Sequence, residues 1–514
     1  MTNLRQRLTL KFRFAPLAMR VALIAVSLLA VACAPVGPDY VRPEAPTNPA
    51  WLDAELAEFE TSPAELAEWW KILGDPLLDE LINTAIKNNN NLRIAGLRVI
   101  ESQASLGIAV GNQYPQVQAV SGDASITDSG DVRLEQYSLG AGLSWEIDFW
   151  GRFRRGVEAA DANLLATIAN YDDVMVLVTA GVADTYMIIL ATEEQLQLAK
   201  DSLELQQRSY DIVNVLFRNG STSELDRLQA KTLLLGTMST IPGLEITLQQ
   251  SKNALSVLLG IAPSRLEQVF KGDGTPPDVP DALNVGLPAD LLRQRPDVRR
   301  AELQALAQNA LVGVAEANLY PSFSLTGFLG ASSIDVDSGN ATIDDLFSSD
   351  SEAFSVGASF VWPFWNYGRI RNNIRVQDAR LQQALVAYQE TVLQAARETE
   401  NAIASLIGTR AQAEILTEGV MVAERSARLA FLRYQEGFAD YQRVLDAQQS
   451  LFSQQQRYAS SRGEVARSLI RMYRSLGGGW QKSTPREFID DTTREQMQER
   501  TNWGDLFENP PPNP

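Results

Sequence analysis

The 514-residue chain contains no histidine and only one cysteine, Cys33. Without histidine, a Ser-His-Asp triad, a Cys-His pair and a histidine metal site are all excluded. A single cysteine also excludes a disulfide within the chain. Carboxylates alone could bind a metal ion, but no cluster of Asp and Glu has a recognisable loop spacing. These absences argue against an enzyme, and neither a metal nor a cofactor is expected.

Basic residues are scarce beyond the N-terminus. The chain has 45 Lys and Arg against 63 Asp and Glu, and five of the basic residues lie in the first 32, where there is no acid. The remainder is therefore strongly acidic. A protein that binds nucleic acid needs basic surface for the phosphates. We therefore expect no nucleic-acid partner.

Long apolar runs are few, and the clearest lies at the N-terminus. A basic stretch is followed by the uncharged run Val21–Ala32, the layout of a secretory signal, so residues 1–32 are read as a signal peptide. The segment Leu29–Cys33 resembles a bacterial lipobox, in which the cysteine is acylated. Ala34 is not the Asp that would favour retention at the inner membrane. Cys33 is therefore the expected lipid anchor, with an ordinary signal and a bystander cysteine as the alternative.

Proline is absent from 116–241 and from 364–484, and these stretches are rich in helix-forming residues. They predict long helices over Gly156–Arg218 and Arg371–Arg433. At ~1.5 Å per residue, each would span about 94 Å, so it must form a rod or part of a tube. The nearest candidate for a membrane span, Val174–Leu190, is shorter than the ~20 residues required and carries a charge. Proline concentrates instead in an N-terminal tether (33–60), a linker (263–290) and a C-terminal tail (481–514) that is expected to be flexible.

The chain repeats itself. Motifs recur at a constant spacing of 217 with no insertion, namely Gly151-Arg152 with Gly368-Arg369, Tyr171 with Tyr388, Gly220 with Gly437, Leu228 with Leu445 and Leu259-Gly260 with Leu476-Gly477. Upstream, Tyr114-Pro115 recurs as Tyr320-Pro321 at a spacing of 206. The sequence therefore predicts two copies of one unit, repeat 1 over 61–262 and repeat 2 over 291–480. Each contains a helix, a β-hairpin (about 116–150 and about 321–365) and a long helix pair.

Strict alternation marks the hairpins. Apolar residues occupy every odd position from Tyr137 to Phe149, and every even position from Phe354 to Phe364, with aromatics crowded at one end. Long strands with one apolar face and an aromatic end are typical of a transmembrane β-barrel, although a half-buried soluble hairpin would alternate too. Four strands cannot close a barrel, since small barrels need about eight. The strands must therefore be completed by other copies, and a trimer would give 12.

In these features the chain resembles the outer membrane factor family, the TolC-like efflux channels, in its NodT-like lipoprotein branch. The resemblance runs from Cys33 to about Trp480 and rests on the order and spacing of several motifs. These are Val36-Gly37-Pro38-Asp39-Tyr40, Trp69-Trp70 with Gly74-Asp75-Pro76, Asn91-Leu92, Trp145 with Gly151-Arg152, Arg295-Pro296-Asp297-Val298-Arg299 with Ala301-Glu302, and Tyr434, Gly437 and Leu445-Asp446-Ala447-Gln448.

The resemblance implies an α+β membrane protein. Three chains would form a 12-stranded β-barrel in the outer membrane, four strands from each, continued by a long α-helical barrel in the periplasm. It also implies a periplasmic adaptor protein and an inner-membrane pump of the RND type. The duct itself would be passive. The alternative is a structural periplasmic lipoprotein of coiled-coil rods with no pore, which would have no use for a lipid-facing strand.

The resemblance also assigns residues. Docking of the adaptor is expected at the two helix-turn-helix tips, at Gly220, Ser223, Glu224, Gly437 and Tyr441. A gate that closes the periplasmic end is expected around Asp446, with Asp440, Gln442, Arg443 and Tyr434. For the glycines, helix termination alone is an equal alternative, and for Asp446 the alternative is an ordinary solvated position. The Arg295-Pro296-Asp297 motif and Trp69-Trp70 are expected to be structural.

Overall fold

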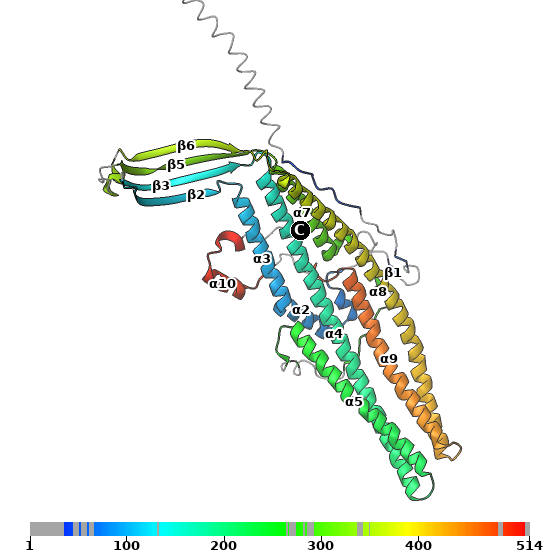
Figure 1. Cartoon of the computed structure of the whole chain (residues 1–514). Helices are drawn as coiled ribbons and strands as arrows, with labels where there is room; N and C mark the ends of the chain where they lie inside the picture. Colours follow the sequence, from blue (N-terminus) through cyan, green and yellow to red (C-terminus); the bar gives the residue numbers. More distant parts are fainter. Residues whose placement is uncertain are drawn as a thin grey trace, which may run out of the picture.

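The computed structural model describes residues 35–44, 51–52, 59–60, 66–130, 133–263, 266, 274–280, 283–284, 292–336, 343–348, 350–481 and 487–508. A four-stranded sheet lies at one end of the molecule, and long helices run from it to the opposite end (Figure 1). The expected signal peptide and Cys33 lie outside the described residues.

The first repeat contains a short helical segment, two helices, a hairpin and a long helix pair. In chain order these are η1 (Trp69–Leu73), α2 (Pro76–Asn88), α3 (Asn90–Gly111), β2 (Val117–Asp128), β3 (Arg133–Ile147), α4 (Arg152–Arg218) and α5 (Glu224–Leu258). From α3 onward the second repeat follows the same order, with η3 (Ile343–Phe347) added between its two strands. Its elements are α7 (Pro296–Ala317), β5 (Ser322–Val336), β6 (Glu352–Val361), α8 (Arg369–Gln435) and α9 (Tyr441–Ser475). The long helices match in length, because α4 and α8 have 67 residues each and α5 and α9 have 35 each.

Four short elements stand outside this plan. The two-residue strands β1 (Phe59–Glu60) and β4 (Leu283–Asn284) pair in parallel. Near the C-terminus, α10 (Asp491–Arg500) is followed by η4 (Gly504–Phe507). These last elements lie in the segment that was expected to be a flexible tail, and that expectation is wrong for 487–508.

The large sheet is antiparallel throughout, in the order β2-β3-β5-β6. Leu143 pairs with Gly327, and Gly327 pairs with Val356, so the odd positions of β3 and β5 share a face with the even positions of β6. That face carries the apolar alternation read from the sequence. The opposite face carries mainly serine, glycine, threonine and acidic residues. The alternation is thus confirmed as one apolar face and one polar face.

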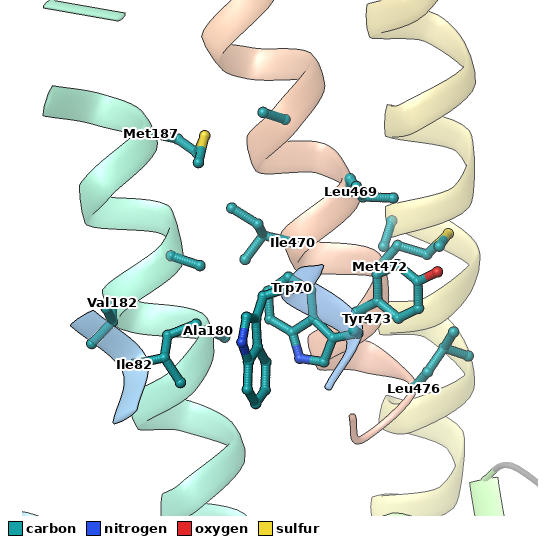
Figure 2. Packing of buried hydrophobic residues seen from close by; sticks show 14 of the residues in the cluster. Trp70, Ile82, Ala180, Val182, Met187, Leu469, Ile470, Met472, Tyr473 and Leu476 are labelled. Carbon is teal, nitrogen blue, oxygen red and sulfur yellow. The ribbon is translucent and has the colours of Figure 1, made fainter. Parts of the chain in front are cut away.

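The main hydrophobic core lies halfway along the helices, where η1 and α2 pack against α4 and α9. Figure 2 shows Trp70 and Ile82 facing Ala180 and Val182 of α4, with Ile470 and Tyr473 of α9 beside them. Trp69 stacks on Tyr473 with ring centroids 5.5 Å apart. Both tryptophans are buried, so the structural role expected for this pair holds.

Among the described residues, α4 is the one helix apolar and long enough to cross a membrane by composition. Of its most apolar window, 67% is buried inside the protein. The window is therefore a core segment of α4, and α4 packs along its length against α2, α3, α5, α7 and α9.

A buried arginine joins the second repeat to this core. Arg295 precedes α7, and its guanidinium donates to Asp297, to Glu398 of α8 and to the Ser475 carbonyl of α9. Burial tends to raise the pKa of Asp297, but the bonds from Arg295 hold that pKa below its usual range. Pro296 occupies the first position of α7, where proline is tolerated. The motif connects three helices, as a structural role requires.

Candidate functional site

Two helical tips lie at the end of the molecule opposite the sheet (Figure 1). Both turns follow the same plan. Gly220 has φ of 74° and Gly437 has φ of 77°, a left-handed backbone that favours glycine. The amide that follows each glycine, in Ser221 or Phe438, bonds back 2.8 Å to a carbonyl five positions earlier. Both glycines therefore terminate helices by a Schellman-type cap.

The first tip is fixed by a capping box. The Ser223 hydroxyl accepts from the Asp226 amide at 3.1 Å, while the Asp226 carboxylate accepts from the Ser223 amide and from the Thr222 hydroxyl. Burial alone would raise the pKa of Asp226, but these hydrogen bonds outweigh burial and lower it. Glu224 is exposed and pairs with Arg227. Ser223 and Glu224 thus lie on the tip surface, where a partner could contact them.

The second tip is capped more weakly. Asp440 precedes α9 but makes no side-chain cap bond, and only its backbone carbonyl accepts from the Arg443 amide. Gln442, Arg443 and Asp446 are all exposed in the single chain. The Gln442 side-chain amide donates to the Asp446 carboxylate at 2.8 Å. Gln442, Arg443 and Asp446 therefore share one solvent-facing side of the start of α9.

Tyr441 does not fit its expected role as a docking residue. Its side chain is only 3% exposed. The hydroxyl lies 2.8 Å from that of Ser209 in α4, and the ring packs edge-on against Tyr434. Burial raises the pKa of Tyr441. We correct the assignment: Tyr441 holds the two hairpins together and presents no surface to a partner.

Tyr434 also links the tips. It is half-buried in α8, and its ring packs against Tyr441 and against the cluster that contains Val213 of α4 and Ala230 of α5. Sequence reasoning missed Ser209, Thr222 and Asp226, which complete this network. A signal for one of them was present, because Ser223 followed at the third position by an acid is a capping-box pattern. Nothing local in the sequence marks Ser209, since its partner Tyr441 lies on the other hairpin.

Known proteins share this fold. The family described as "Outer membrane efflux protein" matches residues 81–261 and 287–478. The chain is 30% identical to the probable outer membrane lipoprotein SilC of Salmonella typhimurium, over 89% of this chain and 98% of that protein. It is 31% identical to the toluene efflux pump outer membrane protein TtgF of Pseudomonas putida, over 92% and 98%. The solved outer-membrane channel OprN superposes with a TM-score of 0.81 at 32% identity, covering 87% of this chain and 99% of OprN.

A β-hairpin pair on two long helical hairpins, matched over nearly all of a solved channel subunit, defines one subunit of an outer-membrane channel with a helical periplasmic extension. The chain belongs to the outer membrane efflux protein family, whose members are channels and not enzymes. The two-repeat architecture and the TolC-like fold expected from the sequence are confirmed. The alternative of coiled-coil rods without a pore does not survive this match.

Proposed function

We propose that three copies of this protein form the exit duct of a tripartite efflux system, through which small molecules pass passively from the periplasm to the outside. The observation that carries the proposal is the sheet. It has one apolar and one polar face, and it stands on helices of 67 residues, about 100 Å at ~1.5 Å per residue. Three such sheets can form a pore in a membrane, and the helices can extend the duct about 100 Å into the periplasm.

The duct requires partners that supply energy and selectivity. A periplasmic adaptor protein docks at the helical tips, and an inner-membrane pump, of the RND type, drives transport. Support comes from the exposed surface at Ser223 and Glu224 and from relatives whose names place them in efflux pumps. The name of the relative TtgF refers to toluene efflux, and toluene is assigned as a substrate to TtgF alone.

The tip of the second hairpin is the gate of the duct. Threefold symmetry would bring three Asp446 carboxylates together near the axis, each already bonded by its own Gln442. Like charges at short range repel, so hydrogen bonds or cations must hold such a ring. Asp440 and Arg443 extend the ring, and Tyr434 packs on the hydrophobic cluster that joins the two hairpins.

Single-channel recording in a planar bilayer tests the duct and its gate together. Asp446→Ala is expected to raise conductance and to weaken block by multivalent cations added on the periplasmic side. Glu499→Ala, which removes an exposed carboxylate of α10 far from the tips, is the matched control and should change neither. Absence of channels from the purified trimer contradicts the duct. Unchanged conductance and block in Asp446→Ala contradict the gate.

Docking is tested at the first tip. Ser223→Arg adds bulk and charge but also removes the cap, so Glu224→Lys is the cleaner change, because Glu224 caps nothing. Ser223→Asp keeps a capping oxygen and serves as the control. We expect Glu224→Lys to abolish co-purification of the adaptor with a tagged channel at an unchanged trimer yield. An equal loss of trimer would mean that the tip serves folding alone.

Cys33 is the proposed lipid anchor. Cys33→Ser should abolish incorporation of labelled palmitate while leaving the channel in the outer membrane, since the barrel also holds it there. Labelled lipid on the Cys33→Ser protein would contradict the assignment.

A further inference from the structure

The sheet has two open edges. β2 and β6 form its borders, and nearly all of their side chains are exposed, whereas most of those in the central strands β3 and β5 are partly covered. An edge of 10 to 12 residues with free backbone donors and acceptors is a template for another strand. The chain's own repeat shows which strand fits and in what alignment.

The contact between β3 and β5 is the template, because it joins the first repeat to the second. In that contact Ala141 lies opposite Leu329. β6 is the repeat-2 counterpart of β3 at the spacing of 217, so Ala141 corresponds to Ala358. In the two hairpin registers, Ala124 pairs with Tyr137, and Leu329 pairs with Phe354, the counterpart of Tyr137. Leu329 therefore corresponds to Ala124, a displacement of 205.

The displacement of 205 differs by one from the 206 that separates Tyr114-Pro115 and Tyr320-Pro321. The structure places this one-residue difference at Gln116, just before β2 begins. The Gln116 side chain bonds both the amide and the carbonyl of Glu146, in the place of a backbone pairing. A register taken from the sequence motif alone would be wrong by one position, and that slip would turn every side chain of β2 to the other face.

We infer that β6 of each copy pairs antiparallel with β2 of the next copy, with Ala358 opposite the partner's Ala124. The rest of the seam follows in steps of one, from Val361 opposite the partner's Ser121 to Phe354 opposite the partner's Asp128. The inference rests on the proposed trimer and adds the residue pairs that close it.

The chemistry of the two edges agrees with this alignment. On the apolar face, Phe360 meets the partner's Gly122, and Val356 meets the partner's Ile126. On the polar face, Ser359 meets the partner's Asp123 and Gly357 meets the partner's Ser125. On the polar face the seam includes one apolar side chain, Val361, opposite the partner's Ser121, and no like charges are opposed.

An aromatic contact beneath the sheet gives an independent check. At the junction of the repeats, Trp150 stacks on Tyr320 with ring centroids 4.5 Å apart and donates to the Pro321 carbonyl. The counterpart of Trp150 is Tyr367, which is 93% exposed in the single chain. The counterpart of Tyr320 is Tyr114, which is also exposed. The seam therefore places Tyr367 against the partner's Tyr114 and covers both rings.

Disulfide trapping in the detergent-solubilised trimer tests the register. Within one chain β2 and β6 are separated by three strand spacings, about 14 Å, so a bond between them can form only between copies. The chain's single cysteine lies at the lipid-anchor position, which leaves a clean background. The matched pairs are Ala124→Cys with Ala358→Cys on the apolar face and Ser125→Cys with Gly357→Cys on the polar face. Neighbouring pairs alternate in hydrogen bonding, so one of them has the geometry that favours a bond.

The control pair is Ile126→Cys with Ala358→Cys, which shifts the alignment by two positions on the same face. We expect oxidation to convert at least one matched pair to covalent trimers, with at least tenfold less product from the shifted pair. More product from the shifted pair, or none from either matched pair in a protein that is trimeric by mass, overturns the register. A protein that is monomeric by mass overturns both the seam and the proposed duct.

Discussion

The long helices α4 and α8 have the same length and equivalent starts, yet they are buried very differently. Each begins after a glycine with positive φ, Gly151 or Gly368. Along its length, α4 buries more than twice as many side chains as α8 does. α4 has neighbours on both flanks, from its own repeat and from the next, whereas α8 has them on one flank. The two helices therefore differ in burial because α4 lies between the two repeats, whereas α8 lies at the outer side of the second repeat.

Equivalent positions make the difference concrete. Val176 of α4 is 4% exposed, and its counterpart Leu393 of α8 is 47% exposed. Ala169 is buried where its counterpart Val386 is exposed. Apolar side chains are retained on α8 although the described part of the single chain leaves them uncovered. A second copy would supply the missing neighbour, with α3 and α5 of that copy taking the places that α7 and α9 take beside α4.

The largest expected effect separates folding from assembly. Val176→Asp buries an unpaired charge inside the chain, which costs several kcal/mol, and should prevent folding. Leu393→Asp puts the same charge at the equivalent place on α8, where it should leave the helices intact and prevent trimer formation. Circular dichroism with light-scattering mass in detergent distinguishes the two. A Leu393→Asp protein that is as trimeric as the parent would show that the flank of α8 is not an interface.

The two ends of the chain extend the comparison between the repeats. The N-terminal segment packs on α7, where Arg42 pairs with Glu302. The C-terminal segment packs on α3, where the Phe488 backbone lies so close to Gly96 that a side chain there would clash. Glu302 and Gly96 are counterparts at the spacing of 206. The N-terminal segment thus covers in repeat 2 the position that the C-terminal segment covers in repeat 1.

Phe488→Ala tests the C-terminal half of that pairing. The Phe488 ring packs edge-on against Tyr171 with centroids 5.1 Å apart, and it joins a cluster with Leu92 and Val99. Truncating a buried phenylalanine costs about 3 kcal/mol. We expect faster proteolysis of 487–508 and a lower melting temperature, with partial recovery in Phe488→Leu. A melting temperature unchanged from the parent would mean that the docked segment adds nothing to the stability of the helices beneath it.

A smaller effect is expected at the tips. Ser223→Ala removes half of the capping box and should cost about 1 kcal/mol, whereas Asp440→Ala in the second tip should cost close to nothing, because Asp440 makes no side-chain cap bond. Hydrogen exchange of the first turn of α5 and of α9 measures each local stability. Equal losses at both tips would contradict the difference in capping.

The smallest effect concerns pH. The folded-state pKa of Asp226 lies below its ordinary value of 3.8, so its contribution is complete above that value and is lost as pH falls through the lower, folded pKa. Protection from exchange at the first tip should weaken below about pH 4. Asp226→Asn should remove this pH step, and Asp440→Asn should leave it intact. A step that persists in Asp226→Asn would assign it to another group.

Much of this architecture could be predicted because its signals are local or periodic. The alternation at Tyr137–Phe149 indicated a strand with two unlike faces, and the constant spacing of 217 indicated the two repeats. The burial of Tyr441 could not be foreseen, since it depends on Ser209 from another helix. The docking of Phe488 on Gly96 had no local signal either. The features that sequence reasoning missed are contacts between segments that are far apart in the chain.

Thiol labelling at equivalent positions tests the central claim, that the two repeats become alike only when three chains assemble. Val176→Cys and Leu393→Cys are compared in the intact trimer and after denaturation, with a maleimide as the probe. The account predicts that both thiols are protected in the trimer and that both react when the protein is denatured. Full-rate labelling of Leu393→Cys in the assembled trimer, with Val176→Cys still protected, would contradict it.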